Sequence, residues 1–237
     1  MKPVLSRFRH KNRIKGKIMF APDFVAQEIF DIVKDEVEKS IDKFSGKPII
    51  LDPCVGQGAL LKPFKKYFGG AIETVGIDIV DYEGRECDTF IQSDWLSITK
   101  QKLDFDRVLF TCLFPPFSDM KTNPDYMKQD ILGRVNFKNK HNSFLPDIFF
   151  SHLLEYIEKP MAYIITPMGF RLNQRTVSHR RNKYMRDNVN KITGIVSYPI
   201  DVFPETLYHS EALIWNVPSI PAHTWGAKTD RTISIFS

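Results

Sequence analysis

Residues 48–61 read PIILDPCVGQGALL, a short apolar run that passes through an acidic residue and two glycines into a second apolar segment. A strand that continues directly into such a loop and a helix is typical of a parallel α/β sheet. Glycines at the end of the strand allow the backbone to approach a ligand closely, and the helix N-terminus behind them presents free N–H groups. The stretch therefore predicts a strand, a ligand-binding loop and a helix in succession, although an ordinary tight turn would have a similar pattern.

The rest of the chain repeats this alternation of short β-branched runs and longer amphipathic stretches. Seven strands are predicted, at residues 48–51, 74–79, 89–92, 107–112, 161–166, 192–198 and 212–217. Helices are predicted at residues 23–43, 60–67, 147–158 and 180–188. Two long irregular stretches remain, at residues 118–144 and 169–179, and loops of that length are often functional. We expect an α/β fold with a seven-stranded, mostly parallel sheet and helices on both faces.

Composition places the chain among ordinary globular proteins. It has 237 residues, of which 43% are hydrophobic and 26% charged, so one domain at residues 16–237 behind a basic arm at residues 1–15 is expected. The net charge of +5 favours polyanionic partners. Three scattered cysteines fit neither a disulfide framework nor a metal site, and no apolar run is long enough to span a membrane. A reducing, cytoplasmic compartment is the expectation.

Two acidic residues follow later strands at the same predicted sheet edge. Asp78 ends the second strand about twenty residues after the glycine loop. At that position a carboxylate can accept hydrogen bonds from both ribose hydroxyl groups of a nucleoside. Asp94 follows the third strand and could accept a hydrogen bond from an adenine amino group, or could instead cap a turn before Leu96. Leu60 stands near the place of the third glycine of a dinucleotide fingerprint, which argues against that cofactor class.

These residues resemble the motifs of S-adenosylmethionine-dependent amino-methyltransferases. DPCVGQG at residues 52–58 is similar to motif I, D-P-x-x-G-x-G, and Asp78 and Asp94 stand at the positions of motifs II and III. Upstream, GKIMFAPDFVAQEI resembles the F-T-P element of motif X, with Ala21 in place of the usual threonine. This element precedes motif I in the γ-ordered N6-adenine methyltransferases, including type I modification subunits.

The resemblance continues along the chain. FLPDIFFSHLLEYI, MAYIITP and YPIDVFPETLYHSEALIWN resemble motifs V, VI and VIII. It implies a class I methyltransferase Rossmann-like fold that binds S-adenosylmethionine. Because little sequence follows the stretch that resembles motif VIII, we expect no separate target-recognition domain. The implied cofactor residues are Phe20, Pro22, Asp52, Pro53, Cys54, Gly56, Gly58, Asp78, Ile79, Asp94 and Trp95.

The segment FTCLFPPFS after the fourth strand resembles motif IV, which normally reads N-P-P-F or a close variant. The resemblance assigns catalytic positions to Phe114, Pro115, Pro116 and Phe117. A carboxamide oxygen and the carbonyl of the first proline can hold both hydrogens of the target amine, but Phe114 offers no side-chain acceptor. Phe117 would stack on a flipped base, or would simply be a core aromatic. An inactive or regulatory protein, an engineered change and an enzyme with another acceptor are all compatible with this departure.

Basic residues concentrate in the two long irregular stretches. The candidates for phosphate contact are Lys121, Lys138, Lys140, Arg171, Arg175, Arg180 and Arg181. A solvated helix face is the alternative for RRNKYMRDNVNK at residues 180–191. We expect an adenine-specific DNA methyltransferase with no resident metal. RNA is the alternative substrate, and the sequence is compatible with a partner subunit or a homo-oligomer. The alternative is a catalytically impaired methyltransferase-like subunit that binds cofactor and nucleic acid as a partner or regulator.

Overall fold

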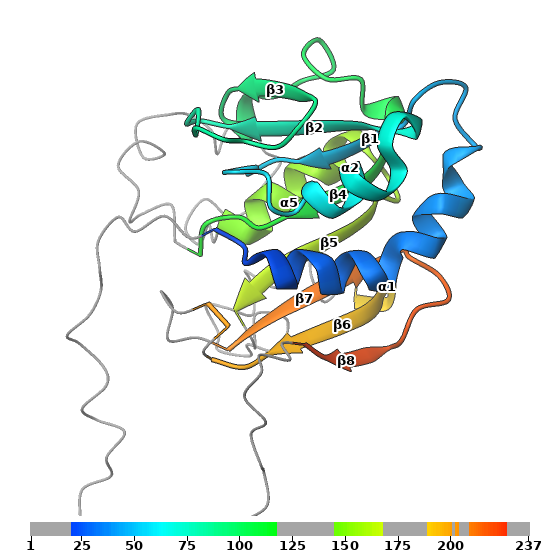
Figure 1. The fold of residues 1–237 in the computed structure, drawn as a ribbon, viewed down its shortest axis with the longest axis vertical. Helices are drawn as coiled ribbons and strands as arrows, with labels where there is room; N and C mark the ends of the chain where they lie inside the picture. Colours follow the sequence, from blue (N-terminus) through cyan, green and yellow to red (C-terminus); the bar gives the residue numbers. More distant parts are fainter. Residues whose placement is uncertain (1–19, 118–144, 168–188, 201, 204–208, 227–237) are drawn as a thin grey trace, which may run out of the picture.

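The computed structural model describes residues 20–117, 145–167, 189–200, 202–203 and 209–226. Their strands form one sheet in the order β3-β2-β1-β4-β5-β7-β6-β8 (Figure 1). The strands are β1 (Ile49–Asp52), β2 (Glu73–Asp78), β3 (Thr89–Gln92), β4 (Val108–Leu113), β5 (Met161–Pro167), β6 (Ile192–Tyr198), β7 (Ser210–Trp215) and β8 (His223–Trp225).

Most strands of this sheet run in the same direction. β1, β2, β3, β4 and β5 pair in parallel, whereas β7 lies antiparallel between β5 and β6, and β8 returns parallel to β6. The mostly parallel sheet is confirmed, but the expected count of seven strands is wrong. β8 adds an eighth strand of only three residues, too short to show an alternating pattern, which exists because His223 and its neighbours pair with Ile195–Ser197.

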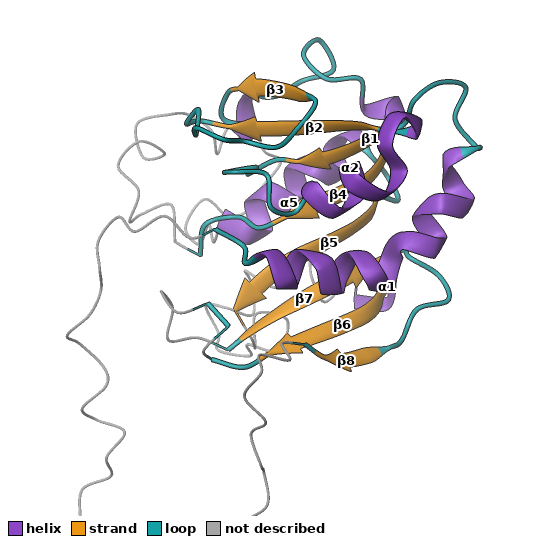
Figure 2. Ribbon diagram, viewed as in Figure 1, coloured by secondary structure: helices purple, strands orange, loops and turns teal. Residues whose placement is uncertain are grey.

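Helices cover both faces of the sheet, as expected (Figure 2). α1 (Asp23–Ile41) and α2 (Lys62–Phe68) pack on one face, and α5 (Leu145–Tyr156) packs on the other. α1 is amphipathic, and its fully buried Val25, Ile29, Val33 and Val37 recur every four residues along the side that contacts the sheet. The helix expected at residues 180–188 lies outside the described residues.

The order of the strands creates one switch point. From β1 the chain moves outward through β2 and β3, then crosses back to pair β4 on the other side of β1 and continues to β5. In open α/β sheets, ligands bind beyond the carboxyl ends of the strands at such a point. Asp52 ends β1 and Phe114 follows β4, so the two predicted motifs meet at this edge.

Candidate cofactor and catalytic site

The loop after β1 requires glycine at two positions, because each has a positive φ and no space for a Cβ. Gly56 has a φ of +51°, and a Cβ there would lie 2.8 Å from Cδ1 of Phe20. Gly58 has a φ of +89°, and a Cβ there would lie 2.7 Å from the backbone oxygen of Glu86. The loop therefore follows a path that other residues adopt only with strain.

Replacing Gly58 by alanine is expected to lower the free energy of unfolding by about 2 kcal/mol, because both a left-handed φ and a backbone clash must be accommodated. Urea unfolding monitored by circular dichroism measures the change. Gly46→Ala is the matched control, since a Cβ at Gly46 meets no atom within 4 Å. Equal midpoints for the two variants would contradict the strain argument.

Asp78 joins the end of β2 to this loop. Its Oδ2 accepts a hydrogen bond from the backbone N–H of Gly56 at 2.9 Å, and its Oδ1 accepts one from the backbone N–H of Val80 at 3.1 Å. The side chain of Ile79, the residue between Asp78 and Val80, is exposed. Two backbone donors hold the carboxylate at the surface of the switch point, where each oxygen retains a lone pair for a ligand hydroxyl.

Asp52 is a fully buried carboxyl group at the end of β1. Its Oδ1 accepts a hydrogen bond from the backbone N–H of Cys54 at 2.9 Å, whereas Oδ2 has no hydrogen-bond partner among the described residues. Burial, and to a lesser degree the nearby Asp78 charge, raises the pKa of Asp52 to about 8. The group is therefore neutral at neutral pH unless a positive charge approaches it.

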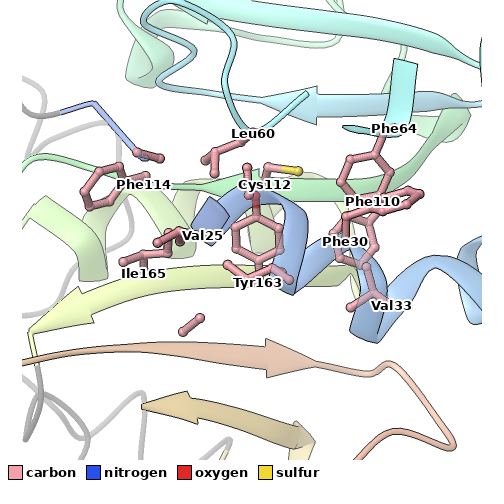
Figure 3. Close-up of a cluster of buried hydrophobic side chains, with 14 of the residues drawn as sticks. Val25, Phe30, Val33, Leu60, Phe64, Phe110, Cys112, Phe114, Tyr163 and Ile165 are labelled. Carbon is pink, nitrogen blue, oxygen red and sulfur yellow. The ribbon is translucent and has the colours of Figure 1, made fainter. Parts of the chain in front are cut away.

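Two further buried polar groups extend from Asp52 across the sheet. Leu51 pairs with Thr111 and Cys112 pairs with Tyr163, so Cys112 and Tyr163 follow Asp52 on the adjacent strands β4 and β5. Figure 3 shows both side chains within the apolar cluster under α1. Burial raises the pKa of the Cys112 thiol and of the Tyr163 hydroxyl well above their ordinary values. Neither group supplies a counter-charge for Asp52.

The third predicted acidic residue has a local role in the structure. Asp94 Oδ1 accepts a hydrogen bond from the backbone N–H of Leu96 at 3.0 Å, which caps the short helix η3 (Trp95–Ser97). The Trp95 indole is buried, and its Nε1 donates to the carbonyl of Phe149 on α5 at 3.0 Å. The turn after Asp94 thus directs the indole into the core on the α5 side of the sheet.

The remaining cofactor candidates surround the same loop. Pro22 precedes the first residue of α1, Pro53 is buried, and Cys54 is half-buried with a pKa raised well above its ordinary value by burial and by the surrounding carboxylates. Phe20 and the glycine loop are in contact. The structure therefore brings Phe20, Asp52, Gly56 and Asp78 to one edge.

The residue at the position where the motif resemblance predicts an acceptor is packed in an aromatic cluster. Phe114 is only 8% exposed, and its ring centroid lies 5.5 Å from that of Phe117 and 5.2 Å from that of Phe203. Figure 3 shows it at the end of the α1-side core, with Leu60 and Ile165 in the same cluster. Pro115 is buried, and Pro116 is exposed. Phe117 is half-buried against this core, and part of its ring remains accessible.

Phe203 was not identified as a site residue from the sequence. It follows β6 in the segment YPIDVF, which lies in the stretch that resembles motif VIII. That resemblance was the available signal, but a local pattern cannot show contact with a ring 89 positions earlier. All seven basic residues assigned to nucleic-acid contact lie outside the described residues.

Within the described part of the chain, the structure has neither a helix long and apolar enough to cross a membrane nor a group of three side chains suited to a metal ion. No protein-family model matches the sequence, and no curated protein matches it significantly.

The chain resembles solved structures of other proteins, among them the following two. The type IIG restriction endonuclease BpuSI is 16% identical, with a TM-score of 0.60 over 88% of this chain and 27% of its own. The methyltransferase subunit of a type I restriction-modification system from Streptococcus thermophilus is 14% identical, with a TM-score of 0.59 over 84% of this chain and 45% of its own. The chain has a Rossmann-like methyltransferase fold. It spans about a quarter to a half of the length of these two proteins.

Proposed function

We propose that the protein is an S-adenosylmethionine-dependent methyltransferase that acts on the N6 amino group of adenine in DNA. The observation that carries the proposal is the meeting of three features at one switch point: the glycine loop after β1, the Asp78 carboxylate after β2 and the Phe-Pro-Pro-Phe segment after β4. The fold shared with restriction-modification proteins agrees with it. The resemblance of the motifs, in γ order, supplies the choice of adenine.

The residues at this edge fit the proposed cofactor. The Oδ2 of Asp52, which has no hydrogen-bond partner among the described residues, suits the ammonium group of the methionine moiety, and Asp78 suits the ribose hydroxyls. Gly56 and Gly58 leave no side chain between the backbone and a ligand. When bound, S-adenosylmethionine supplies an activated methyl group, and the chain supplies its binding and orientation.

Cofactor binding is expected to release about one proton at pH about 6.5, because Asp52 is protonated in the free protein and ionises beside a cationic ammonium group. A carboxyl group with a raised pKa carries its proton below that value and has lost it above, so the release should disappear as the pH rises well past about 8. Calorimetry with S-adenosylhomocysteine in buffers of different ionisation enthalpy measures this proton.

Asp52→Asn is the control for the proton release, because it keeps the shape of the side chain and cannot titrate. Its binding heat should be independent of the buffer. A wild-type binding heat that is also independent of the buffer would show that Asp52 does not ionise on binding.

The target amine would be oriented by the chain at the end of β4. An amine conjugated to a ring is a poor nucleophile, and acceptors that hold its hydrogens become more favourable as positive charge develops on nitrogen. The carbonyl of Pro115 is one such acceptor, and the locked φ angles of Pro115 and Pro116 fix the direction of this segment. Phe117 would pack against the base after it leaves the duplex. Lys121, Lys138, Lys140, Arg171, Arg175, Arg180 and Arg181 would contact phosphates, and specificity would come from their two loops or from a partner subunit.

A second candidate function is a cofactor-binding subunit with little catalytic activity of its own, acting as a partner or regulator in the reducing, cytoplasmic setting that the free cysteines suggest. The burial of Phe114 against Phe117 and Phe203 favours it, because an aromatic ring occupies the place of a polar acceptor.

Mass spectrometry of nucleosides separates the two functions. DNA is incubated with the protein and isotope-labelled S-adenosylmethionine, and RNA is treated in parallel. Labelled N6-methyladenine in DNA is the expected product. Cofactor binding without any labelled nucleoside would favour the second function, and label confined to RNA would overturn the choice of DNA.

A further inference from the structure

The outer face of α1 carries a line of exposed carboxylates. The buried residues of this helix face the sheet, and Asp31, Asp35 and Glu38 follow one another on the opposite side, with Asp42 at the C-cap continuing the line. Oδ1 of Asp31 lies 3.8 Å from Nζ of Lys34, and within the described part of the chain none of the other three forms an ion pair. These four side chains form the acidic stripe of α1.

Neighbouring carboxylates of the acidic stripe repel one another. Successive members are three or four residues apart, the spacing at which side chains on a helix are neighbours and like charges destabilise it. At 1.5 Å per residue, the stripe is about 16 Å long and its charges lie about 5 to 6 Å apart. The repulsion would be removed by a partner that carries several positive charges at a similar spacing along the helix.

A segment with this charge pattern precedes α1 in the same chain. Residues 7–17 read RFRHKNRIKGK, with Lys or Arg at every second position and no acidic residue. A period of two places all six basic side chains on one side of an extended chain, about 6.5 Å apart. This basic segment therefore matches the acidic stripe both in sign and in the spacing of its charges.

The basic segment is also long enough to cover the stripe. The structure describes the chain from Phe20, three residues before α1 begins at Asp23. An extended segment from Arg7 to Lys17 spans about 33 Å, and α1 is about 28 Å long. With a reversal of the chain at residues 18–19, as at the two central residues of a turn, the segment can run back along α1 as far as Asp42.

We propose that the basic segment at residues 7–17 docks along the acidic stripe of α1 in the same molecule, with its Lys and Arg side chains against the four carboxylates. The inference does not depend on the proposed cofactor function, which makes no use of the outer face of α1. Several charges of each sign along one line form a network, which contributes more than isolated surface ion pairs do. Because the carboxylates are exposed, the docking should weaken as the salt concentration rises.

Chemical cross-linking of the full-length protein tests the docking. A water-soluble carbodiimide joins a lysine amine to a carboxylate that it touches, and mass spectrometry identifies the joined peptides. Cross-links from Lys11, Lys15 and Lys17 to the acidic stripe are expected, and raising the salt to about 0.5 M should reduce them by at least about fivefold, because screening is then strong over the length of a side chain. An equal mixture of unlabelled and isotope-labelled protein shows whether each cross-link joins parts of one molecule.

Asp104 and Asp106 provide the matched control. Both are exposed, and they flank Phe105, which packs in the core on the α5 side of the sheet. They should form few cross-links with the basic segment. Neutralising the stripe with Asp35→Asn, Glu38→Gln and Asp42→Asn should make trypsin cleave residues 7–17 at least about fivefold faster, because a docked segment must detach before a protease binds it. Asp104→Asn with Asp106→Asn should leave the cleavage rate unchanged, and circular dichroism shows that both variants are folded.

Three results would overturn the inference. Cross-links to Asp104 and Asp106 as frequent as those to the stripe would show that the basic segment has no preferred dock. Cross-links that join unlabelled to labelled protein would show that the stripe binds a second copy of the chain. An equal cleavage rate in wild type and in the stripe variant would show that the carboxylates do not hold the segment, and a nucleic-acid backbone would then be its better partner.

Discussion

Replacing Phe114 by asparagine is expected to increase the rate of N6-methyladenine formation by about a hundredfold, because the substitution restores a preorganised acceptor beside the carbonyl of Pro115. The acceptor would act on the amine as positive charge develops, so the gain should appear in kcat. Quantifying N6-methyladenine in DNA under saturating cofactor measures it.

The structure indicates that this substitution also lowers the stability of the folded protein. Phe114 is buried and contacts the rings of Phe117 and Phe203, so removal of its ring is expected to lower the free energy of unfolding by about 3 kcal/mol. Rates must therefore be compared at a temperature at which both proteins are folded and bind the cofactor equally. Phe114→Leu is the control, since it changes the packing without supplying an acceptor and should leave the rate low.

The opposite result would be equally informative. If wild type already methylates adenine rapidly and Phe114→Asn slows the reaction, the aromatic ring belongs to the active arrangement and the proposed role of this position fails. The acceptor must then come from elsewhere, and the candidates are Ser118, Asp119 and Asn142. All three lie outside the described residues.

Replacing Asp78 by alanine is expected to weaken cofactor binding by about 1.5 to 3 kcal/mol, the range for hydrogen bonds to a charged group. The structure shows a second reason for a large effect. The Asp78 carboxylate accepts hydrogen bonds from the backbone N–H groups of Gly56 and Val80. Its loss therefore also releases the glycine loop from the end of β2. Calorimetric titration with S-adenosylhomocysteine measures the affinity.

Asp81→Ala provides the comparison for Asp78→Ala. Asp81 is an exposed carboxylate three residues later that forms an ion pair with Arg85, so its removal changes the local charge without touching the loop. The affinity of Asp81→Ala for S-adenosylhomocysteine should be close to that of wild type. An unchanged affinity in Asp78→Ala would remove Asp78 from the proposed ribose site.

Sequence periodicity predicted most of the secondary structure that positions the site. Each of the seven expected strands is present, and α1 begins at the expected residue Asp23. The errors lie at the ends of elements and in the shortest strand. α5 begins at Leu145, two residues before the expected start. β8 is not predicted by the sequence pattern because its three residues form a strand only by pairing with β6.

The roles of individual side chains were less predictable than the elements that carry them. Both a ligand contact and a cap were open for Asp94, and the structure shows the cap. The motif resemblance places Trp95 among the cofactor residues because it follows Asp94. In the structure its indole N–H donates a hydrogen bond to the carbonyl of Phe149, 54 positions later. A motif identifies the backbone position, whereas the neighbours from distant segments decide which way the side chain faces.

The sequence by itself determined the α/β class, the strand-loop-helix around residues 48–61 and the carboxylate after the second strand, because apolar periodicity and glycine conformation act over a few residues. The tertiary structure alone decided that Asp52 is fully buried with a pKa of about 8, that Phe114 packs against Phe203, and that Phe20 and Tyr82 meet over Gly56. Each of these depends on groups brought together from segments distant in the chain. Desolvation and ring contact are set by which groups surround a side chain in space, and strand order and packing determine those groups.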